Sequence, residues 1–193
     1  LGQGIIKSLK QSKLDYILFG TDYFNTAVGL YWVKKGYILP DILKNDIDDK
    51  LWLEKLINII QSNNIEIIIP GLDFEIPLLS KYKKLIEDKT KAIILVSKSD
   101  IVEICNDKWK TINFLHEKGF EVPYTVLPEN KNEIIKNLQF PFIVKPRFGH
   151  TSKEIFLVKN ESELEYAISN CSQPIVQEYL DKAYKTMKAY VGQ

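Results

Sequence analysis

Short apolar runs alternate with helix-like segments through the first half of the chain, and this alternation constrains the fold more than any other feature. Four runs have the length and residue types of buried strands, at residues 16–20, 37–39, 65–70 and 91–97. Three intervening segments have the length or periodicity of helices, at residues 21–36, 48–64 and 74–88. Strands that alternate with helices across short loops favour a parallel sheet covered on both faces. We therefore expect an α/β domain over residues 1–97.

The first residues, LGQGIIKSLKQS, form a glycine-bearing turn that already leads into a helix. A doubly wound sheet normally opens with a strand before such a turn. We therefore expect that the first strand of this domain is missing and that the sequence starts inside the domain.

The pattern changes after residue 98. Further strands are expected at residues 122–127, 140–146, 154–160, 174–180 and 184–192, and helices at residues 99–105, 107–118, 130–138 and 161–170. Strands that pair across a short polar loop, followed by a helix and more strands, are typical of an antiparallel α+β lobe. We expect this lobe to occupy residues 98–193, and the sequence stops within its pattern.

Composition and charge exclude several classes of partner. The formal net charge of +1 gives no electrostatic footprint for nucleic acid. No apolar run approaches the roughly 18 residues that a membrane helix needs, and the first residues do not form a signal peptide. The two cysteines lack the spacing of metal ligands, which indicates reduced thiols and a cytoplasmic protein.

The stretch FPFIVKPRFGHTSKEI, residues 140–155, places Lys145 directly behind a buried strand. The small and polar residues that follow, with Gly149 among them, allow the backbone to approach a ligand closely, and consecutive amide groups there can form an anion site. Arg147 and Lys153 offer further donors for phosphate oxygens. The alternative is an ordinary turn in which Lys145 reaches solvent from an edge strand.

Two further segments fit the same interpretation. In PIVQEYL, the polar Gln177 and Glu178 come just before the end of a strand, where backbone groups can read an adenine edge beside Tyr179 and Leu180. In NDKWK, Lys108 stands at the start of a helix, where the helix dipole favours an acid instead. An exposed edge strand and a plain surface lysine are the alternatives for these two segments.

Taken in order, NDKWKTINFLHEKGFEVPYT, FPFIVKPRFGHTSKEIFLV and PIVQEYL resemble the ATP-grasp superfamily, and within it the carbamoyl-phosphate-synthase-like ligases. GTDYFNTAVGLYWVKKGYILP and IIPGLDFEIPLLS are similar to the domain that precedes the ATP-grasp domain in this family. The resemblance covers nearly the whole chain. It implies a Rossmann-like pre-ATP-grasp domain over residues 1–97, followed by a truncated nucleotide-binding lobe over residues 98–193.

The resemblance also implies roles for particular residues. Lys108 and Lys145 match the two basic residues that reach the nucleotide phosphates. The hinge that holds adenine corresponds to Gln177, Glu178, Tyr179 and Leu180, and the mobile loop over the phosphates corresponds to His150, Thr151 and Ser152, followed by Lys153. Enzymes of this family use ATP and Mg²⁺ to activate a carboxylate as an acyl phosphate, which an amine or similar nucleophile then attacks.

The sequence departs from the family pattern at three places. Glu154 stands where the family often has glycine, and it brings a negative charge near a polyphosphate. The segment YKTMKAY, residues 184–190, has no acid where the family often has one for the ribose. The acids that bind Mg²⁺ in the family lie in a later lobe, so we expect no metal site and no identifiable catalytic residue in this chain. The chain is then a fragment of a ligase or one subunit of a split enzyme, and we expect no turnover from it alone.

Three acidic residues of the first domain lie at expected carboxyl ends of strands, where ligands bind in open α/β sheets. Asp22 follows the run at residues 16–20, and Asp73 and Glu75 follow the run at residues 65–70. They are candidates for contact with the acceptor substrate or with the second domain. The alternative is helix capping, for which Asp73 is well placed.

Two other functions remain open from the sequence. LGQG can be the remnant of a dinucleotide fingerprint with Asp22 as the ribose acid, which would indicate an NAD-dependent oxidoreductase, although the third glycine is replaced by Lys7. The missing ribose acid and Glu154 favour a non-catalytic nucleotide sensor or a partner subunit. The expected partners are a nucleotide, small carboxylate and amine substrates, and a second copy or another subunit.

Overall fold

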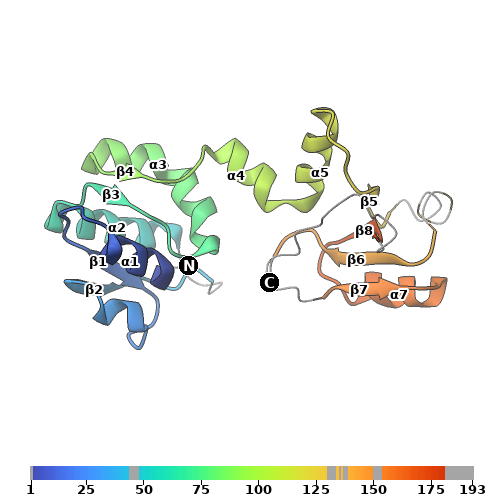
Figure 1. The fold of residues 1–193 in the computed structure, drawn as a ribbon, viewed down its shortest axis with the longest axis horizontal. Helices are drawn as coiled ribbons and strands as arrows, with labels where there is room; N and C mark the ends of the chain where they lie inside the picture. The colour runs from blue at the N-terminus through green and yellow to red at the C-terminus, as the bar shows by residue number, and fades with distance from the viewer. Residues whose placement is uncertain are drawn as a thin grey trace. The chain divides into compact units, whose positions relative to one another are not determined.

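A computed structural model describes residues 2–43, 48–129, 134, 136, 139–149 and 154–180 (Figure 1). The chain divides into two compact units, Leu1–Val102 and Glu103–Gln193. Each unit has its own cluster of buried apolar residues. None of the described helices is both long enough and apolar enough to cross a bilayer.

The first unit alternates helices and short strands. In chain order they are α1 (Gly2–Gln11), β1 (Phe19–Asp22), the 3-10 turn η1 (Val28–Tyr31), β2 (Lys35–Ile38), α2 (Asp49–Asn63), β3 (Ile67–Ile68), the 3-10 turn η2 (Asp73–Glu75), α3 (Ile76–Thr90) and β4 (Ile93–Ile94). β1 pairs with β2 and β3 pairs with β4, both in parallel. The parallel pairing expected from the sequence is therefore confirmed.

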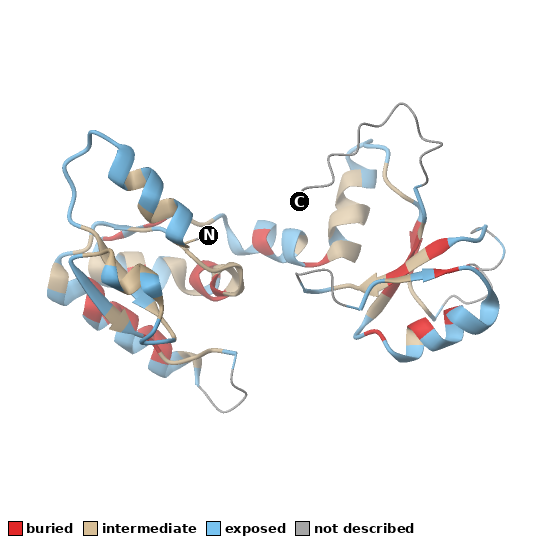
Figure 2. Ribbon diagram, turned by 60° about the horizontal axis from the view of Figure 1, so that its bottom comes forward, coloured by how far each residue is buried: buried red, intermediate tan, exposed pale blue. Residues whose placement is uncertain are grey.

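Helices α2 and α3 supply most of the first core. Buried residues of α2 include Trp52 and Ile60, and Leu79 and Ile86 of α3 belong to the same buried cluster as Ile94 of β4. Figure 2 shows buried positions in red along helices of this unit. Helix α2 starts at a cap in which the Asp48 carboxylate accepts the Lys50 N–H. Helix α3 carries proline in its first turn, where no intrahelical N–H is needed.

A hollow of about 530 Å³ separates the two parallel pairs of the first unit. It is lined by residues of α1, β1, α2, β3 and η2, among them Trp52, Ile67 and Glu75. The lining is mainly aliphatic, and the Trp52 indole Nε1–H has no hydrogen-bond partner among the described residues.

The helix expected over residues 21–36 is wrong. The Asp22 carboxylate accepts the N–H groups of Tyr23 (2.8 Å) and Phe24 (3.0 Å), which turns the chain as soon as β1 ends. Only the short turn η1 follows, and Gly36 lies in β2 and not at a helix end. A Cβ atom on Gly36 would come within 2.8 Å of the Leu30 Cβ, so glycine is needed there for η1 to pack on β2.

The second unit is an antiparallel sheet with helices. Its elements are α4 (Ser99–Asn106, which begins in the first unit), α5 (Lys108–Glu117), β5 (Thr125–Val126), β6 (Phe142–Pro146), β7 (Phe156–Val158), α7 (Glu161–Ser169) and β8 (Pro174–Glu178). The strand order is β5-β8-β6-β7, and every pairing is antiparallel. Leu164 and Ala167 of α7 belong to the same buried cluster as Phe142, Val144 and Val158. This is the α+β lobe that the sequence predicts.

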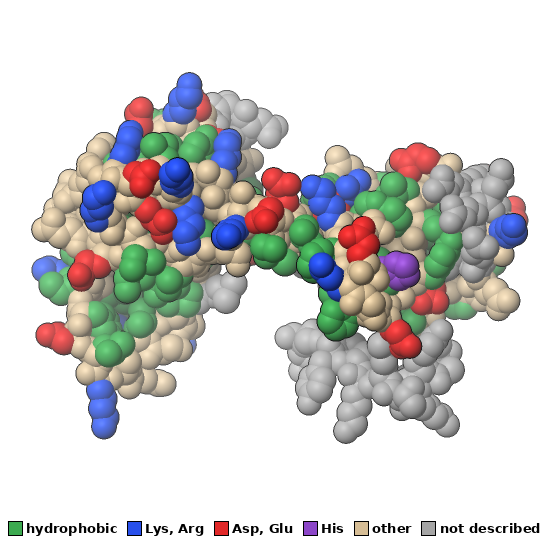
Figure 3. All heavy atoms as spheres, turned by 90° about the horizontal axis from the view of Figure 1, so that it is seen from above, with side chains coloured by type: hydrophobic (Ala, Val, Ile, Leu, Met, Phe, Trp, Pro, Cys, Tyr) green, Lys and Arg blue, Asp and Glu red, His purple; other side chains and the backbone are tan. Residues whose placement is uncertain are grey.

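Two expected elements, a helix over residues 130–138 and a strand over residues 184–192, lie largely or wholly outside the described residues. Both cysteines are free, Cys105 exposed and Cys171 buried. On the face of the first unit seen in Figure 3, basic and acidic side chains are interspersed and do not gather by sign.

Candidate functional site

Lys108 is the first residue of α5, and the residue before it fixes the start of this helix. The Asp107 carboxylate accepts the N–H groups of Trp109 (3.0 Å) and Lys110 (3.3 Å), which is the bonding of a helix cap. The Lys108 ammonium group donates to the Gly149 carbonyl oxygen at 3.0 Å. The side chain expected to meet phosphate therefore lies against the start of the loop that follows β6.

Lys145 lies in β6, beside the neighbouring strand β8. Its ammonium group donates to Gln177 Oε1 at 2.7 Å, and Gln177 Nε2 donates to Thr125 Oγ1 at 2.9 Å. The Lys145 side chain is half-buried, and Gln177 is buried. Three strands of the sheet thus contribute to one chain of polar contacts that holds the lysine.

The two lysines affect each other electrostatically. Burial lowers the pKa of Lys145, and the positive charge of Lys108 lowers it further. Burial also lowers the pKa of Lys108, although the Asp107 carboxylate acts against this. Within the described residues neither ammonium group forms an ion pair, since each donates to a neutral oxygen. Among the described residues the unit therefore holds two neighbouring lysines that form no direct ion pair, with the Asp107 carboxylate as the acidic group that acts on Lys108.

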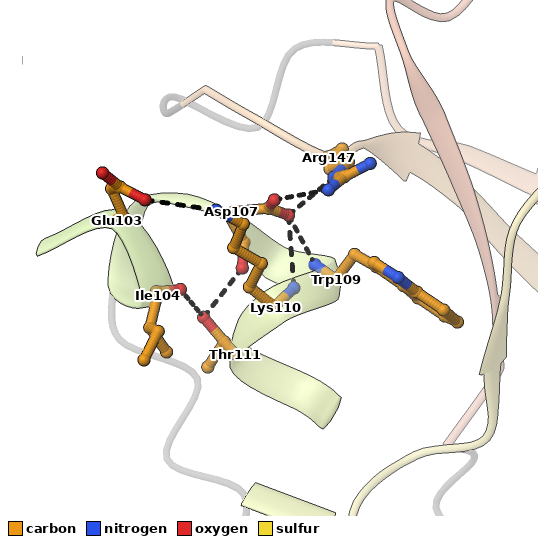
Figure 4. Close-up of polar contacts among 7 residues, drawn as sticks. All are labelled: Glu103, Ile104, Asp107, Trp109, Lys110, Thr111 and Arg147. Atoms are coloured by element: carbon orange, nitrogen blue, oxygen red, sulfur yellow. Dashed lines mark hydrogen bonds and ion pairs between the residues drawn. The ribbon is translucent and has the colours of Figure 1, made fainter. Parts of the chain in front are cut away.

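Arg147 has a different role from the one that its position in the loop suggests. Its guanidinium group binds Asp107 through two contacts, Nε to Oδ1 at 2.8 Å and Nη2 to Oδ2 at 2.7 Å (Figure 4). Burial alone would raise the pKa of Asp107, but Arg147 and the N–H groups of Lys110 and Trp109 outweigh this effect and lower it. Two of the five N–H donors of Arg147 are therefore engaged by Asp107, and the expectation that Arg147 offers donors to phosphate can concern only the remaining ones.

The predicted hinge is only partly open to a ligand. The Gln177 side chain is engaged with Lys145 and Thr125, and the Glu178 carboxylate accepts the Tyr124 N–H at 2.9 Å. The Glu178 N–H donates to the Tyr124 carbonyl oxygen, also at 2.9 Å. Tyr179 and Leu180 follow the end of β8 and are 38% and 40% exposed. Their backbone and side chains are the part of the hinge that is free to meet a base.

The loop after β6 begins at Gly149, whose φ of +106° is a conformation that suits glycine. The predicted loop residues His150, Thr151, Ser152 and Lys153 lie outside the described residues. Glu154 has a φ of +56°, so the family's preference for glycine at this position has a backbone reason. Its carboxylate accepts the Ser172 N–H at 2.7 Å, which ties the charge to the chain before β8.

The acidic residues of the first unit separate into two groups. Asp22 and Glu75 both line the hollow between the strand pairs, and Asp73 is not part of that lining. The Tyr23 hydroxyl donates to Glu75 Oε1 at 2.7 Å. Burial raises the pKa of Glu75; the bond from Tyr23 acts against this, and Asp22 adds to it. The Asp73 carboxylate accepts the Phe74 N–H at 3.0 Å, a local contact at the start of η2.

Among the described residues no group of three or more His, Cys, Asp or Glu side chains is arranged to hold a metal ion. The contact between Asp107 and Arg147 is the feature of this site that sequence reasoning missed. The position of Asp107 immediately before a helix is the signal of a cap, but nothing in the sequence shows that Arg147 meets it from 40 residues away.

Comparisons with known proteins concern the sequence and the fold of the chain. Residues 105–188 match the ATP-grasp domain family. Over 192 residues the chain is 24% identical to the large chain of carbamoyl phosphate synthase from Pyrococcus furiosus, which covers 93% of this chain and 17% of that protein.

Two solved structures share the fold. N5-carboxyaminoimidazole synthetase from Staphylococcus aureus, complexed with ADP, superposes with a TM-score of 0.69 at 21% identity, over 94% of this chain and 45% of that one. The biotin carboxylase domain of 2-oxoglutarate carboxylase from Hydrogenobacter thermophilus, in complex with MgADP, superposes with a TM-score of 0.68 at 17% identity. The match covers 94% of this chain and 42% of that one. The chain thus spans less than half the length of each of these relatives. Residues 105–188 thus match the ATP-grasp domain, and nearly the whole chain is similar in sequence to a carbamoyl phosphate synthase large chain and in fold to ATP-grasp ligases.

Proposed function

We propose that this chain carries the ATP-binding part of an ATP-dependent ligase. One observation supports the proposal most directly: Lys108 and Lys145 are brought together from a helix start and a strand, and neither is paired with a carboxylate among the described residues. Two desolvated cations that repel each other are costly in a folded protein, and a polyphosphate relieves that cost. The neutral oxygens of Gly149 and Gln177 are partners that phosphate oxygens can replace.

In this proposal the residues of the second unit bind and orient the nucleotide. Lys108 and Lys145 neutralise phosphate oxygens, residues 148–153 contribute backbone amides, and residues 177–180 hold the adenine, with Tyr179 and Leu180 as its contact surface. Positioning and charge neutralisation are the main contributions of a protein to phosphoryl transfer. The activated group is a carboxylate, which becomes an acyl phosphate and is attacked by an amine or similar nucleophile.

When bound, Mg²⁺ would neutralise charge on the phosphates. The described residues offer no group of ligands for it, so we assign no residue of this chain to the metal. We expect its ligands outside the described residues, and we expect residues 1–193 to bind nucleotide without turnover.

We assign residues 1–97 to a pre-ATP-grasp domain and residues 98–193 to the nucleotide-binding lobe of the ATP-grasp domain. Asp22 and Glu75, which share the hollow of the first unit, are the better candidates for contact with an acceptor substrate, and Asp73 is the weaker one. We also propose a cytoplasmic location, with a second copy of the chain or a separate catalytic subunit as partner.

A non-catalytic nucleotide sensor is the second candidate, because its site would need the two lysines and no metal ligands. An NAD-dependent oxidoreductase is disfavoured, since the Asp22 carboxylate is already engaged by the N–H groups of Tyr23 and Phe24. The ATP-grasp match over residues 105–188 also has no counterpart in hydride chemistry.

Calorimetric titration of ATP–Mg²⁺ tests the proposal. We expect Lys145→Ala and Lys108→Ala each to weaken binding by about 1–3 kcal/mol, or roughly fivefold to 150-fold, because each removes a charge-assisted contact to phosphate. Lys159→Ala is the matched control, an exposed lysine of the same unit just after β7, and should bind as the unchanged protein does. Wild-type affinity in both Lys108→Ala and Lys145→Ala would remove these residues from the site and overturn the proposal.

A further inference from the structure

The Asp107 carboxylate performs two tasks at one place. It caps α5 by accepting the N–H groups of Trp109 and Lys110, and it accepts both contacts of the Arg147 guanidinium group (Figure 4). Its side chain is only 2% exposed, whereas that of Arg147 is 29% exposed. A planar guanidinium group bound through two nitrogens is fixed in distance and in orientation. The start of α5 is therefore held in a defined position relative to the end of β6.

The backbone of the same region adds two further constraints. The Lys108 N–H donates to the Arg147 carbonyl oxygen at 3.0 Å, and the Arg147 N–H donates to the Gln173 carbonyl oxygen at 2.9 Å. Arg147 therefore holds the start of α5 at two adjacent residues. Its guanidinium group binds Asp107, and its carbonyl oxygen accepts the Lys108 N–H. Any shift of Arg147 moves the point from which the Lys108 side chain extends toward Gly149.

A role in stability alone explains this pair poorly. Only the Asp107 side of this pair is fully buried, and the cost of removing that charge from water offsets much of the attraction to Arg147. The carboxylate engages Nε and one N–H of Nη2, so the guanidinium group cannot turn toward a ligand without breaking this pair, even though other N–H groups remain. Both observations are compatible with a third role, in which the ion pair fixes the position of a neighbouring group.

We infer that the Asp107–Arg147 pair is a positioning device for Lys108, which sets the distance between its ammonium group and that of Lys145 so that both meet the same polyphosphate. This inference rests on the proposed function. It makes Asp107 and Arg147 positioning residues, which act on the ligand through Lys108 and do not touch it.

The test is a double-mutant cycle on ATP–Mg²⁺ affinity in the full chain. Arg147→Lys keeps the charge but loses the planar fork, and Asp107→Asn keeps a good cap but loses the ion pair. Each change should weaken ATP binding about tenfold, as expected for a charge-assisted contact that is no longer aligned. In a Lys108→Ala background the same changes should have almost no further effect, because the group that they position is gone.

Two controls separate positioning from general damage. Glu103→Gln breaks the exposed ion pair between Glu103 and Lys110 (3.3 Å) beside the same helix start and should leave ATP affinity unchanged. Adenosine, which has no phosphates, should bind equally to the unchanged protein and to Arg147→Lys. If Arg147→Lys disturbs the fold, adenosine binding falls too, and Asp107→Asn then carries the test.

The possible outcomes distinguish the two proposals. If both lysine variants bind ATP normally, the proposed function fails and the inference fails with it. If the lysine variants lose affinity but Arg147→Lys and Asp107→Asn do not, only the inference is overturned. Equal losses in the presence and absence of Lys108 also overturn it, because they would place Arg147 on the phosphate itself.

Discussion

Glu75 is a carboxyl group that the first unit removes almost completely from water, with 8% of its surface exposed. Its pKa is raised by burial, and the Tyr23 hydroxyl, at 2.7 Å, offsets only part of that effect. Ionised Glu75 is therefore less stable in the folded protein than in the unfolded chain. The stability of the first unit should decline as the pH rises from the ordinary glutamate range through the raised pKa.

We expect Glu75→Gln to remove this decline, because an amide keeps an acceptor for the Tyr23 hydroxyl and carries no charge to bury. Urea unfolding measured between pH 4 and pH 8 should show higher stability for Glu75→Gln than for the unchanged protein at pH 7, and convergence at acid pH. Glu54→Gln, an exposed carboxyl of α2, is the control and should not alter the pH profile. A profile that Glu75→Gln leaves unchanged would show that Glu75 is not strained by ionisation.

In the second unit, candidate site residues could be proposed from the sequence where they lie next to a recognisable helix start or strand. Lys145 behind a strand and Lys108 at a helix start were proposed as site residues from the sequence, and the charge of Lys108 acts on Lys145 in the structure. The pairing of Asp107 with Arg147 was not predictable, since it depends on which strand end meets which helix start. Local patterns do not contain that information.

At the scale of elements, periodicity and caps were reliable guides, and strand length was not. Helices α2, α3 and α7 follow apolar spacing with a cap or a proline at the start, and their predicted ranges agree with the structure. The strands expected at residues 65–70 and 91–97 shrink to Ile67–Ile68 and Ile93–Ile94. An apolar run shows burial, whereas strand length depends on how many residues find a partner.

The edge of β4 shows how tertiary contacts limit a strand. From helix α3, Lys83 Nζ donates to the carbonyl oxygens of Ile94 (2.7 Å) and Val96 (3.0 Å), and Glu87 Oε1 accepts the Ile94 N–H (3.0 Å). Side chains of the helix thus occupy backbone groups that another strand would use. Such coverage protects an edge from pairing with other chains.

Glycines in different elements should respond in opposite ways to alanine. Gly149→Ala should lower the free energy of unfolding of the second unit by about 1 kcal/mol, because a φ of +106° strains any residue with a Cβ atom. Gly4 lies in helix α1, and an added Cβ atom there would have nothing within 4 Å. Gly4→Ala should therefore raise the free energy of unfolding of the first unit by roughly 0.5–1 kcal/mol. Chemical denaturation measures both, and effects of equal sign would contradict the backbone argument.

At the scale of the whole molecule, the two units have separate cores, and the proposed nucleotide contacts come from the second unit alone. A ligand stabilises the unit that binds it by mass action. Whole-protein architecture was predictable because alternating parallel pairs and an antiparallel lobe leave different patterns in the sequence. The location of metal ligands was not predictable from the sequence. Among the described residues no group of three or more His, Cys, Asp or Glu side chains is arranged to hold a metal ion.

Differential scanning calorimetry should therefore show two transitions, of which ATP–Mg²⁺ shifts only the one that belongs to the second unit. At a hundred times its Kd the nucleotide should stabilise that unit by about 2.7 kcal/mol. Lys145→Ala is the reference and should reduce the shift at the same concentration. A nucleotide that shifts the first unit instead would move the site away from Lys108 and Lys145.

The lowered pKa values of Lys108 and Lys145 have a consequence for the solution around the protein. Phosphate oxygens would raise both pKa values again, so in alkaline buffer nucleotide binding must draw protons from the solvent. Affinity then weakens as the pH climbs through the depressed values, and the apparent heat of binding changes with the ionisation enthalpy of the buffer. Nucleotide binding in alkaline buffer would therefore be coupled to proton uptake by Lys108 and Lys145.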